Sequence, residues 1–318
     1  MAFSINPTTE ELLGEFKELN EPRTVEEVKK SRNAFLEWKG LEIVERVVFL
    51  KKASSILKKN SRKYGELITK EMGKPIRQSI AEVEKCALTC EFYAENADDL
   101  LCTQEIKTDA KRSYITYEPL GTILGIMPWN FPFWQVFRFA AGTMVAGNTI
   151  VVKHASNVPQ CAIAIEEVFR EANLPENVYK NLTISSKTVA SLVNADLVDG
   201  LSLTGSTEAG SKVGGLAGKN LKRVVLELGG NDPFIVLEDA NIEKSARTAV
   251  TARFQSNGQS CVAAKRFLLH QKIAEEFKER FLELVEKMVV GDPMDQKTDL
   301  GPLARADMRE TLEKQLNE

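Results

Sequence analysis

The stretch "FQSNGQSCVAAKRF", residues 254–267, places one cysteine in a polar loop that contains a glycine. Cys261 could be a small buried side chain, a metal ligand or a nucleophile. Gly258 and the small Ser260 allow a turn that would present the sulfur. A nucleophilic cysteine needs a lowered pKa or a nearby charge, so that role requires partners from elsewhere in the chain.

Two other polar residues stand where the backbone is constrained. In "MPWNFPFWQVFR", Pro128 and Pro132 bracket Asn130 and fix the backbone around it. Its amide could donate to an oxyanion; the alternative is that it caps the following helix. In "VVLELGGND", Glu227 ends a strand just before two glycines. It is a candidate general base, or a structural carboxylate satisfied by backbone donors.

Two further features suit a phosphate-bearing ligand. "LSLTGSTEAG", residues 201–210, predicts a strand that turns at Gly205 and Ser206 into a helix, whose free N–H groups favour an anion. Ser206 adds a hydroxyl donor. An ordinary strand-to-helix turn is the alternative. Lys153, at the end of the strand "IVVKHAS", could reach a ribose hydroxyl or a phosphate, or could be a solvated lysine.

The elements that must position these residues alternate between short apolar strands and helices from residue 121 onward. This pattern predicts an α/β fold with a doubly wound parallel sheet, which binds ligands at the carboxyl ends of its strands. Residues 24–98 show helical spacing, with Thr24 as the expected first cap and Glu27 completing a capping box. Residues 102–120 predict a hairpin of half-exposed strands that could contact another subunit.

Bulk composition excludes several classes of protein. The 318 residues suffice for two domains, and a net charge of −3 with a pI near 5.8 gives no nucleic-acid footprint. No apolar run is long enough for a bilayer, so no membrane partner is expected. The first twenty residues lack a secretory pattern, and we expect a cytoplasmic protein.

Cysteine and histidine usage predicts no metal site. The five cysteines are an odd number, which favours free thiols in a reducing compartment. Cys86 and Cys90 share a helix face, but two sulfurs alone do not bind zinc. The two histidines are far away in sequence. The expectation for the four cysteines other than Cys261 is that they are small buried side chains: Cys86, Cys90, Cys102 and Cys161.

Taken together, the order and spacing of these motifs resemble the aldehyde dehydrogenase superfamily, and most closely its bacterial succinate-semialdehyde dehydrogenase branch. The resemblance covers nearly the whole chain. The matching motifs are Pro128-Trp129-Asn130-Phe131-Pro132, Lys153, Gly205-Ser206, Glu227-Leu228-Gly229-Gly230, Gly258-Gln259-Ser260-Cys261, "GDP" at 291–293 and "LGPL" at 300–303.

The resemblance implies a catalytic role for three residues. Cys261 would attack an aldehyde carbon, and Asn130 with the Cys261 backbone N–H would hold the oxyanion. Hydride would pass to the nicotinamide and leave a thioester. Glu227 would activate water to release a carboxylic acid, whereas relatives that acylate coenzyme A commonly lack this base. The residues expected to bind the dinucleotide are Trp129, Lys153, Ser156, Gly205, Ser206 and Leu228.

Cofactor and substrate preference follow from two positions in the resemblance. NAD-preferring relatives often carry a glutamate where this chain has Ser156, so we expect NAD or NADP to be accepted. Arg138 is expected to bind the distal carboxylate of succinate semialdehyde. Two departures from related patterns are Gln255, where some relatives have a second arginine, and Phe139, where many have a lysine.

The resemblance also predicts the domain organisation. Residues 1–101 and 121–231 would form the dinucleotide-binding domain, 102–120 the oligomerisation hairpin, and 232–318 the N-terminal part of a catalytic domain. Relatives continue beyond residue 318, so we expect a C-terminally truncated chain. The alternative to an active enzyme is an inactive remnant that at most binds dinucleotide. Family members are homo-oligomers, an assembly that truncation would impair.

Overall fold

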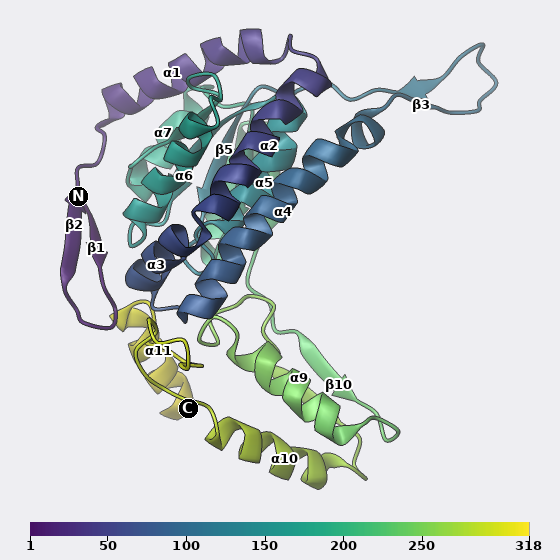
Figure 1. The fold of residues 1–318 in the computed structure, drawn as a ribbon. Coiled ribbons are helices and arrows are strands. Elements are labelled where there is room, and N and C mark those ends of the chain that lie inside the picture. The colour runs from purple at the N-terminus through teal and green to yellow at the C-terminus, as the bar shows by residue number, and fades with distance from the viewer. Residues whose placement is uncertain (318) are drawn as a thin grey trace.

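The computed structural model describes residues 1–317, and a five-stranded parallel sheet lies at its centre (Figure 1). The strands follow the order β7-β6-β5-β8-β9. The chain builds outward from β5 on one side and returns to β8 on the other, so the sheet is doubly wound with its switch point between β5 and β8. The strands are β5 (Thr122–Met127), β6 (Thr149–His154), β7 (Tyr179–Asn181), β8 (Gly200–Thr204) and β9 (Arg223–Glu227).

Both faces of this sheet are covered by helices, and β6 illustrates why. Ile150 and Val152 belong to the larger apolar core, whereas Val151 points to the opposite face and a smaller core. On the larger core side lie α2 (Ile43–Lys59), α3 (Ser61–Met72), α4 (Ile76–Leu101), α5 (Trp134–Val145) and α6 (Pro159–Glu171). On the other side lie α1 (Glu21–Trp38), α7 (Ser186–Asn194) and α8 (Thr207–Lys219).

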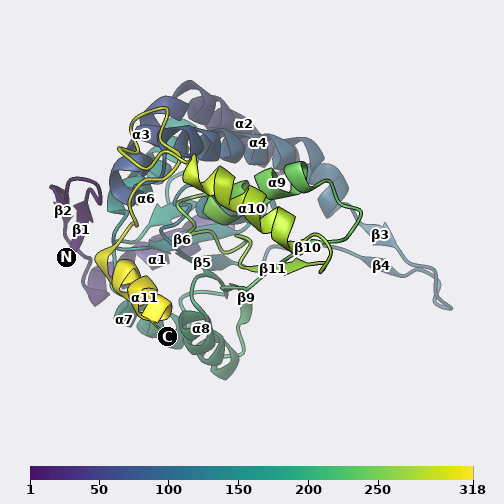
Figure 2. The same cartoon turned by 90° about the horizontal axis from the view of Figure 1, so that it is seen from below.

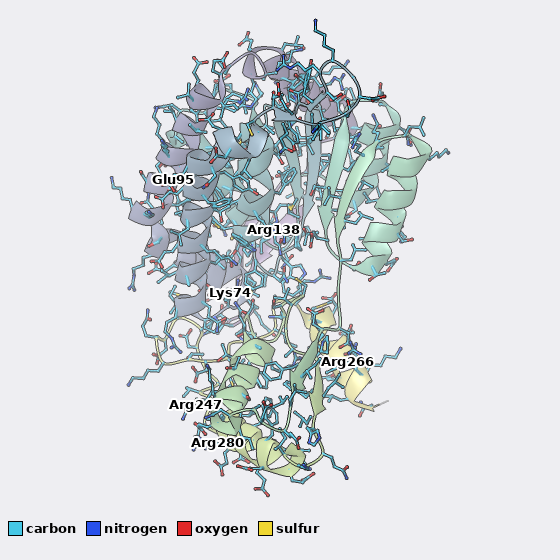
Figure 3. The ribbon with its side chains drawn as sticks, turned by 90° about the vertical axis from the view of Figure 1, so that its right-hand side faces the viewer. Lys74, Glu95, Arg138, Arg247, Arg266 and Arg280 are labelled. Carbon is cyan, nitrogen blue, oxygen red and sulfur yellow. The ribbon has the colours of Figure 1, made fainter. Side chains whose placement is uncertain are left out.

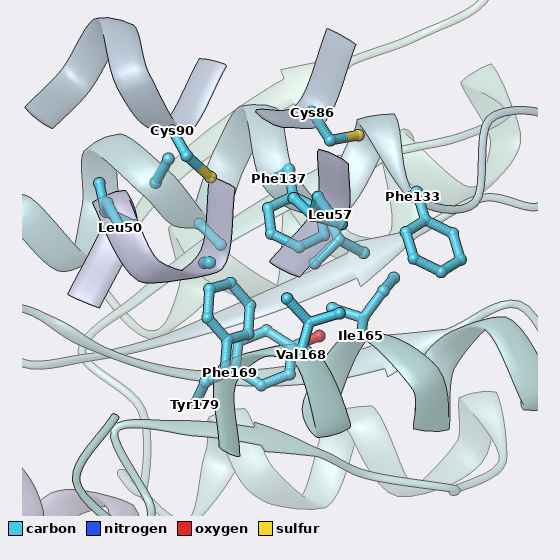
Figure 4. Packing of buried hydrophobic residues seen from close by; sticks show 14 of the residues in the cluster. Leu50, Leu57, Cys86, Cys90, Phe133, Phe137, Ile165, Val168, Phe169 and Tyr179 are labelled. Atoms are coloured by element: carbon cyan, nitrogen blue, oxygen red, sulfur yellow. The ribbon is translucent and has the colours of Figure 1, made fainter. Parts of the chain in front are cut away.

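Aromatic rings fill the larger core (Figure 4). The ring centroids of Phe137 and Phe169 are 5.1 Å apart, and those of Phe169 and Tyr179 are 4.7 Å apart. Contacts at these distances add to the free energy gained by burying the rings. They tie α5, α6 and β7 together on the larger core side of the sheet.

Two antiparallel hairpins flank the sheet. One is formed by β1 (Ala2–Ile5) and β2 (Leu12–Phe16). The other is formed by β3 (Gln104–Glu105) and β4 (Tyr114–Ile115), and it protrudes from the body in both views (Figures 1 and 2). Its strands are only two residues long and exposed. The fold class predicted from the sequence, including this protruding hairpin, is confirmed.

A second and smaller α/β unit follows the sheet. It contains β10 (Pro233–Val236), α9 (Ile242–Phe254), β11 (Arg266–Leu269) and α10 (Ala274–Glu286), and α11 (Ala306–Asn317) lies beyond it. The two strands pair in parallel, and α9 and α10 cover one of their faces around Phe277. Among residues 1–317, no helix combines the length and the apolar character needed to cross a bilayer.

Two local expectations were wrong. Helix α1 begins at Glu21 with Asn20 as its cap, and Thr24 lies inside the first turn, where its hydroxyl donates to the Asn20 carbonyl at 2.8 Å. A proline in the first turn favours this earlier start. Cys102 is exposed rather than buried, because it caps the end of α4 where the chain leaves for the hairpin.

Candidate active site

The structure brings the loops of Asn130 and Cys261 into direct contact. Asn130 follows β5, and its Nδ2 donates to the carbonyl of Gln259 at 2.9 Å. In return, the hydroxyl of Ser256 donates to the Asn130 carbonyl at 3.3 Å. Gln259 lies two residues before Cys261. The predicted oxyanion donor and the predicted nucleophile therefore come from neighbouring loops.

Asn130 has one amide hydrogen without a partner in residues 1–317, and it could donate to a ligand. An asparagine amide carries two N–H donors, and the Gln259 carbonyl uses one of them. The Asn130 Oδ1 is buried and has no hydrogen-bond partner within residues 1–317. The alternative role as a helix cap is wrong, because α5 begins at Trp134 with Phe133 as its cap. The Asn130 amide is therefore held by the loop that contains Gln259 and Cys261, not by helix α5.

Cys261 is half-buried, in contrast to most other cysteines. Cys86, Cys90 and Cys161 are buried, and burial in apolar surroundings raises the pKa of each thiol. A thiol with a raised pKa is a poor nucleophile at neutral pH. The expectation that these three are small core side chains agrees with their burial. Accessibility leaves only Cys261 and Cys102 as reactive candidates among the five.

Glu227 lies at the end of β9 and pairs with Arg138 of α5. Their Oε2 and guanidinium nitrogen are 3.5 Å apart, and the side chains are 54% and 39% exposed. Both line an open groove of about 900 Å³ between α5 and the β8–β9 edge (Figure 3 labels Arg138). No hydrogen bond joins Glu227 to Asn130 or Cys261 in the part of the chain described. The predicted base thus has Arg138 as its charged neighbour.

The residues predicted to bind the dinucleotide lie at the carboxyl ends of the strands. Ser206 caps α8, where its Oγ accepts from the Ala209 N–H at 3.2 Å and its own O–H stays available to donate. Lys153 is half-buried near the end of β6; burial lowers its pKa, and no carboxylate pairs with it among residues 1–317. Ser156 is exposed. An unpaired ammonium and an open helix N-terminus fit the anionic groups of a dinucleotide.

Trp129 and Leu228 were predicted to contact the dinucleotide from motif resemblance. Trp129 is half-buried beside the larger core, in the loop of Asn130. Leu228 follows β9 and packs closely on α8: a Cβ added at Gly210 would lie 2.4 Å from its side chain. Gly210 therefore lets α8 approach the strand end, and a larger residue there would displace the helix N-terminus.

Sequence reasoning missed a set of residues beneath the two loops. Glu82 of α4 accepts from the N–H groups of Phe133 and Trp134 at 2.9 and 3.0 Å, so it caps α5 from a distance. Lys74 is buried and pairs with Glu82. The local signal was a lysine and a glutamate eight residues apart around a helix start, which is too common to single out.

Comparison with known proteins decides the family. The family model described as "Aldehyde dehydrogenase family" matches residues 2–318. The chain belongs to the aldehyde dehydrogenase family. The superfamily resemblance read from the motifs is thereby confirmed.

Several relatives of this aldehyde dehydrogenase are named as succinate-semialdehyde dehydrogenases. It is 46% identical over 305 residues to a probable succinate-semialdehyde dehydrogenase [NADP(+)] of Synechocystis sp., covering 96% of this chain and 67% of the relative. It is 41% identical to a succinate semialdehyde dehydrogenase [NAD(P)+] of Escherichia coli, covering 99% of this chain and 68% of the relative. The chain thus spans about two thirds of the length of these relatives.

Solved structures agree with the fold. The crystal structure of succinic semialdehyde dehydrogenase from Streptococcus pyogenes in complex with NADP+ superposes with a TM-score of 0.97 at 34% identity. It is covered over 70% of its length, and this chain over 100%. The predicted incomplete second domain is consistent with that coverage. At 34% identity, this structural similarity supports membership of the same family as well as a shared fold.

Proposed function

We propose that this chain carries the site of an NAD- or NADP-dependent aldehyde dehydrogenase that oxidises an aldehyde to a carboxylic acid through a thioester on Cys261. The observation that carries the proposal is the 2.9 Å contact between the Asn130 amide and the loop of Cys261. An oxyanion donor and a nucleophile from adjacent loops are what acyl transfer requires. The names of the relatives support the same reaction class.

In the first half of the reaction, the Cys261 thiol releases its proton to solvent and its sulfur adds to the aldehyde carbon. The carbonyl electron pair moves onto oxygen, which accepts from the free Asn130 Nδ2 hydrogen and the Cys261 N–H. Fixed donors of this kind stabilise charge that develops in the transition state. The dinucleotide, when bound, supplies the hydride acceptor. An acyl group then remains on the sulfur.

In the second half, Glu227 takes a proton from water while the water oxygen adds to the acyl carbon, and Cys261 leaves as thiolate. Glu227 suits this role because it is half-exposed at a strand end, where water reaches it. Its Oε2 lies 3.5 Å from the Arg138 guanidinium, and both side chains line the groove beside β9.

The dinucleotide would lie across the carboxyl ends of β6 and β8. Lys153 would meet the adenosine ribose or its phosphate, and the turn at Gly205 and Ser206 would hold the pyrophosphate. Ser156 places no carboxylate against a 2′-phosphate, so we propose that NADP is accepted as well as NAD. The complete proposed set is Trp129, Lys153, Ser156, Gly205, Ser206 and Leu228.

Succinate semialdehyde is the proposed substrate. Arg138 lines the groove beside Glu227, and its guanidinium has five N–H donors, enough to serve Glu227 and a substrate carboxylate together. A charge-assisted pair of this kind discriminates an acidic aldehyde from a neutral one. The names of the relatives support this choice.

A second candidate is a chain that binds dinucleotide without turnover. The exposed apolar side chains of the second unit favour it, since Ile235 and Leu237 are 61% and 62% exposed in the region that carries Cys261. An open apolar face weakens the support that a catalytic loop needs.

The test of the function is reduction of NAD and NADP by the purified chain with succinate semialdehyde, followed by absorbance of the reduced nicotinamide. We expect Cys261→Ala to abolish turnover because the acyl carrier is lost, while Cys90→Ala retains it. Equal loss in both variants would remove Cys261 from the mechanism. Dinucleotide binding without turnover in the folded parent chain would establish the second candidate.

Substrate choice is tested by Arg138→Ala. We expect the KM for succinate semialdehyde to rise about 10- to 100-fold, because a hydrogen bond to a charged group is lost, while the KM for butyraldehyde changes little. Arg223→Ala is the matched control, since Arg223 lines the same groove near the other end of β9. Equal effects on both aldehydes would make Arg138 structural.

A further inference from the structure

The corner between α3 and α4, residues 73–82, contacts the loop that carries Cys261. The Gln78 Oε1 accepts from the backbone N–H of Ser256 at 2.7 Å. The Gly73 carbonyl accepts from the Asn257 Nδ2 at 2.8 Å. Asn257 is held from its other side as well, because its Oδ1 accepts from the Gly301 N–H at 2.9 Å. Two successive residues of the cysteine loop are thus fixed by this corner.

These contacts are made by a segment whose backbone conformation is unfavourable without support from its surroundings. Ser256, Asn257 and Gly258 all have positive φ, at 56°, 56° and 71°. Two of the three are not glycine, so the left-handed conformation costs free energy that surrounding contacts must offset. Ser256 is also fully buried, where an N–H without an acceptor would be unfavourable. The hydrogen bond from Ser256 to Gln78 therefore stabilises the turn that leads to Cys261.

The same corner contacts the loop of Asn130. Glu82 accepts from the N–H groups of Phe133 and Trp134, and Lys74, which pairs with Glu82, has its Nζ 3.7 Å from the centroid of the Phe131 ring. Phe131 is the residue after Asn130. Figure 3 shows Lys74 where the helices of the larger body meet the second unit.

The corner is itself firmly held. Lys74 and Glu82 are 0% and 4% exposed, and a buried ion pair with further hydrogen bonds has one arrangement rather than several. A single rigid element therefore touches both loops of the site. Direct contacts between the loops, from Asn130 to Gln259 and from Ser256 to Asn130, complete the connection.

We infer that the α3–α4 corner sets the position of Cys261 relative to Asn130, with Gln78 as the positioning residue for the cysteine loop and Glu82 for the asparagine loop. This inference rests on the proposed function for its catalytic meaning. Its structural part, that Gln78 holds the Cys261 loop, is independent of turnover. Neither residue is proposed to touch the substrate; each acts through a loop.

The experiment measures alkylation by iodoacetamide, residue by residue, by mass spectrometry of the full chain. Gln78→Met removes the acceptor at nearly constant volume, and Gln78→Glu keeps an oxygen in its place. Exposed Cys102 is the internal reference. The buried thiols of Cys86, Cys90 and Cys161 report unfolding, because only an opened core would expose them.

We expect Gln78→Met to raise the alkylation rate of Cys261 at least about threefold relative to Cys102, because the turn before it loosens. The three buried thiols should stay unreacted, and Gln78→Glu should restore the parent rate. Gln160→Met is the matched control, since that half-buried glutamine donates to Ser4 at 3.0 Å, away from both loops. A Cys261 rate unchanged in Gln78→Met, or raised equally in Gln160→Met, overturns the inference.

Turnover supplies the second readout. In Gln78→Met we expect kcat to fall about tenfold with the KM for dinucleotide unchanged, since misplacing a reacting group costs rate rather than cofactor binding. Loss of kcat without rescue by Gln78→Glu would contradict a positioning role. If the parent chain shows no turnover, the proposed function fails, and the alkylation rates still decide whether Gln78 holds the loop.

Discussion

The central sheet and the second unit both pair short apolar strands in parallel, but they bury them very differently. In each of β5 and β6, five of the six residues are buried. In β10 one residue of four is buried, and in β11 none is. The two sheets differ in the number of strands and in the helices that cover them, since helices lie on both faces of the first and on one face of the second.

The difference follows the alternation of side chains along a strand. In the second unit, Phe234 and Val236 face α9 and α10, while Ile235 points away and lies beside Leu268 of β11. Both of these outward residues are apolar. The composition of a strand therefore predicts that it belongs to a sheet. The free energy gained by burying it depends on the helices and strands that pack against it.

One matched pair of substitutions tests this comparison most strongly. Ile150 of β6 is 0% exposed and Ile235 of β10 is 61% exposed, and each lies inside a parallel strand. We expect Ile150→Ala to lower the free energy of unfolding by about 4 kcal/mol, within the range for a buried isoleucine. Ile235→Ala should change it by less than about 0.5 kcal/mol.

The measurement is urea unfolding followed by circular dichroism, with the midpoints compared at constant slope. The three tryptophans all precede residue 135, so fluorescence would report the larger body alone and is the wrong signal for Ile235. Comparable losses in the two variants would mean that the outer face of β10 is covered in solution. The contrast between the two units would then be smaller than the structure indicates.

Local pattern sufficed to predict the sheet and the strand-to-helix turn at the end of one of its strands. Strands alternating with helices from residue 121 predict a doubly wound sheet, and the turn at Gly205 and Ser206 is the start of α8 as expected. The residues alone left Asn130, Glu227 and Cys261 each with an alternative role. Their grouping came from family resemblance, because no local rule states which loops of a folded chain will touch.

The features that could not be predicted from the sequence are contacts between residues far apart in the chain. Glu82 and Phe133 are separated by 51 positions, and Gln78 and Ser256 by 178. Such contacts leave no periodicity, since each partner is an ordinary polar residue in its own helix or loop. Thr24 failed for a different, local reason: its capping box was plausible, but Asn20 caps the helix and a proline in the first turn favours that earlier start.

The two histidines sharpen the comparison between the units by a smaller effect. His154 ends β6 and His270 directly follows β11, so both stand at the carboxyl end of a parallel strand. His154 is 6% exposed, whereas the His270 side chain is 39% exposed. The His154 Nε2 lies 2.9 Å from the Pro132 carbonyl, and its Nδ1 accepts from the Ala155 N–H at 2.8 Å. The neutral ring with its proton on Nε2 satisfies both contacts.

Burial lowers the pKa of His154 to about 4, with Lys153 acting in the same direction and the Pro132 hydrogen bond opposing it. The unfolded chain, with a pKa near 6.5, therefore binds a proton that the folded chain does not between these values. Stability is complete above about pH 6.5 and is lost as the pH falls toward 4, by roughly 3 kcal/mol in total from this ring.

We expect His154→Gln to flatten the fall in unfolding free energy between pH 6.5 and 4, because the variant has no imidazole to protonate on unfolding. His270→Gln is the matched control, which removes the chain's other imidazole from an exposed strand end. Urea midpoints at half-unit pH steps measure both slopes. An equal flattening in the two variants, or none in His154→Gln, would contradict the view that packing on both faces of the sheet is what separates these two strand ends.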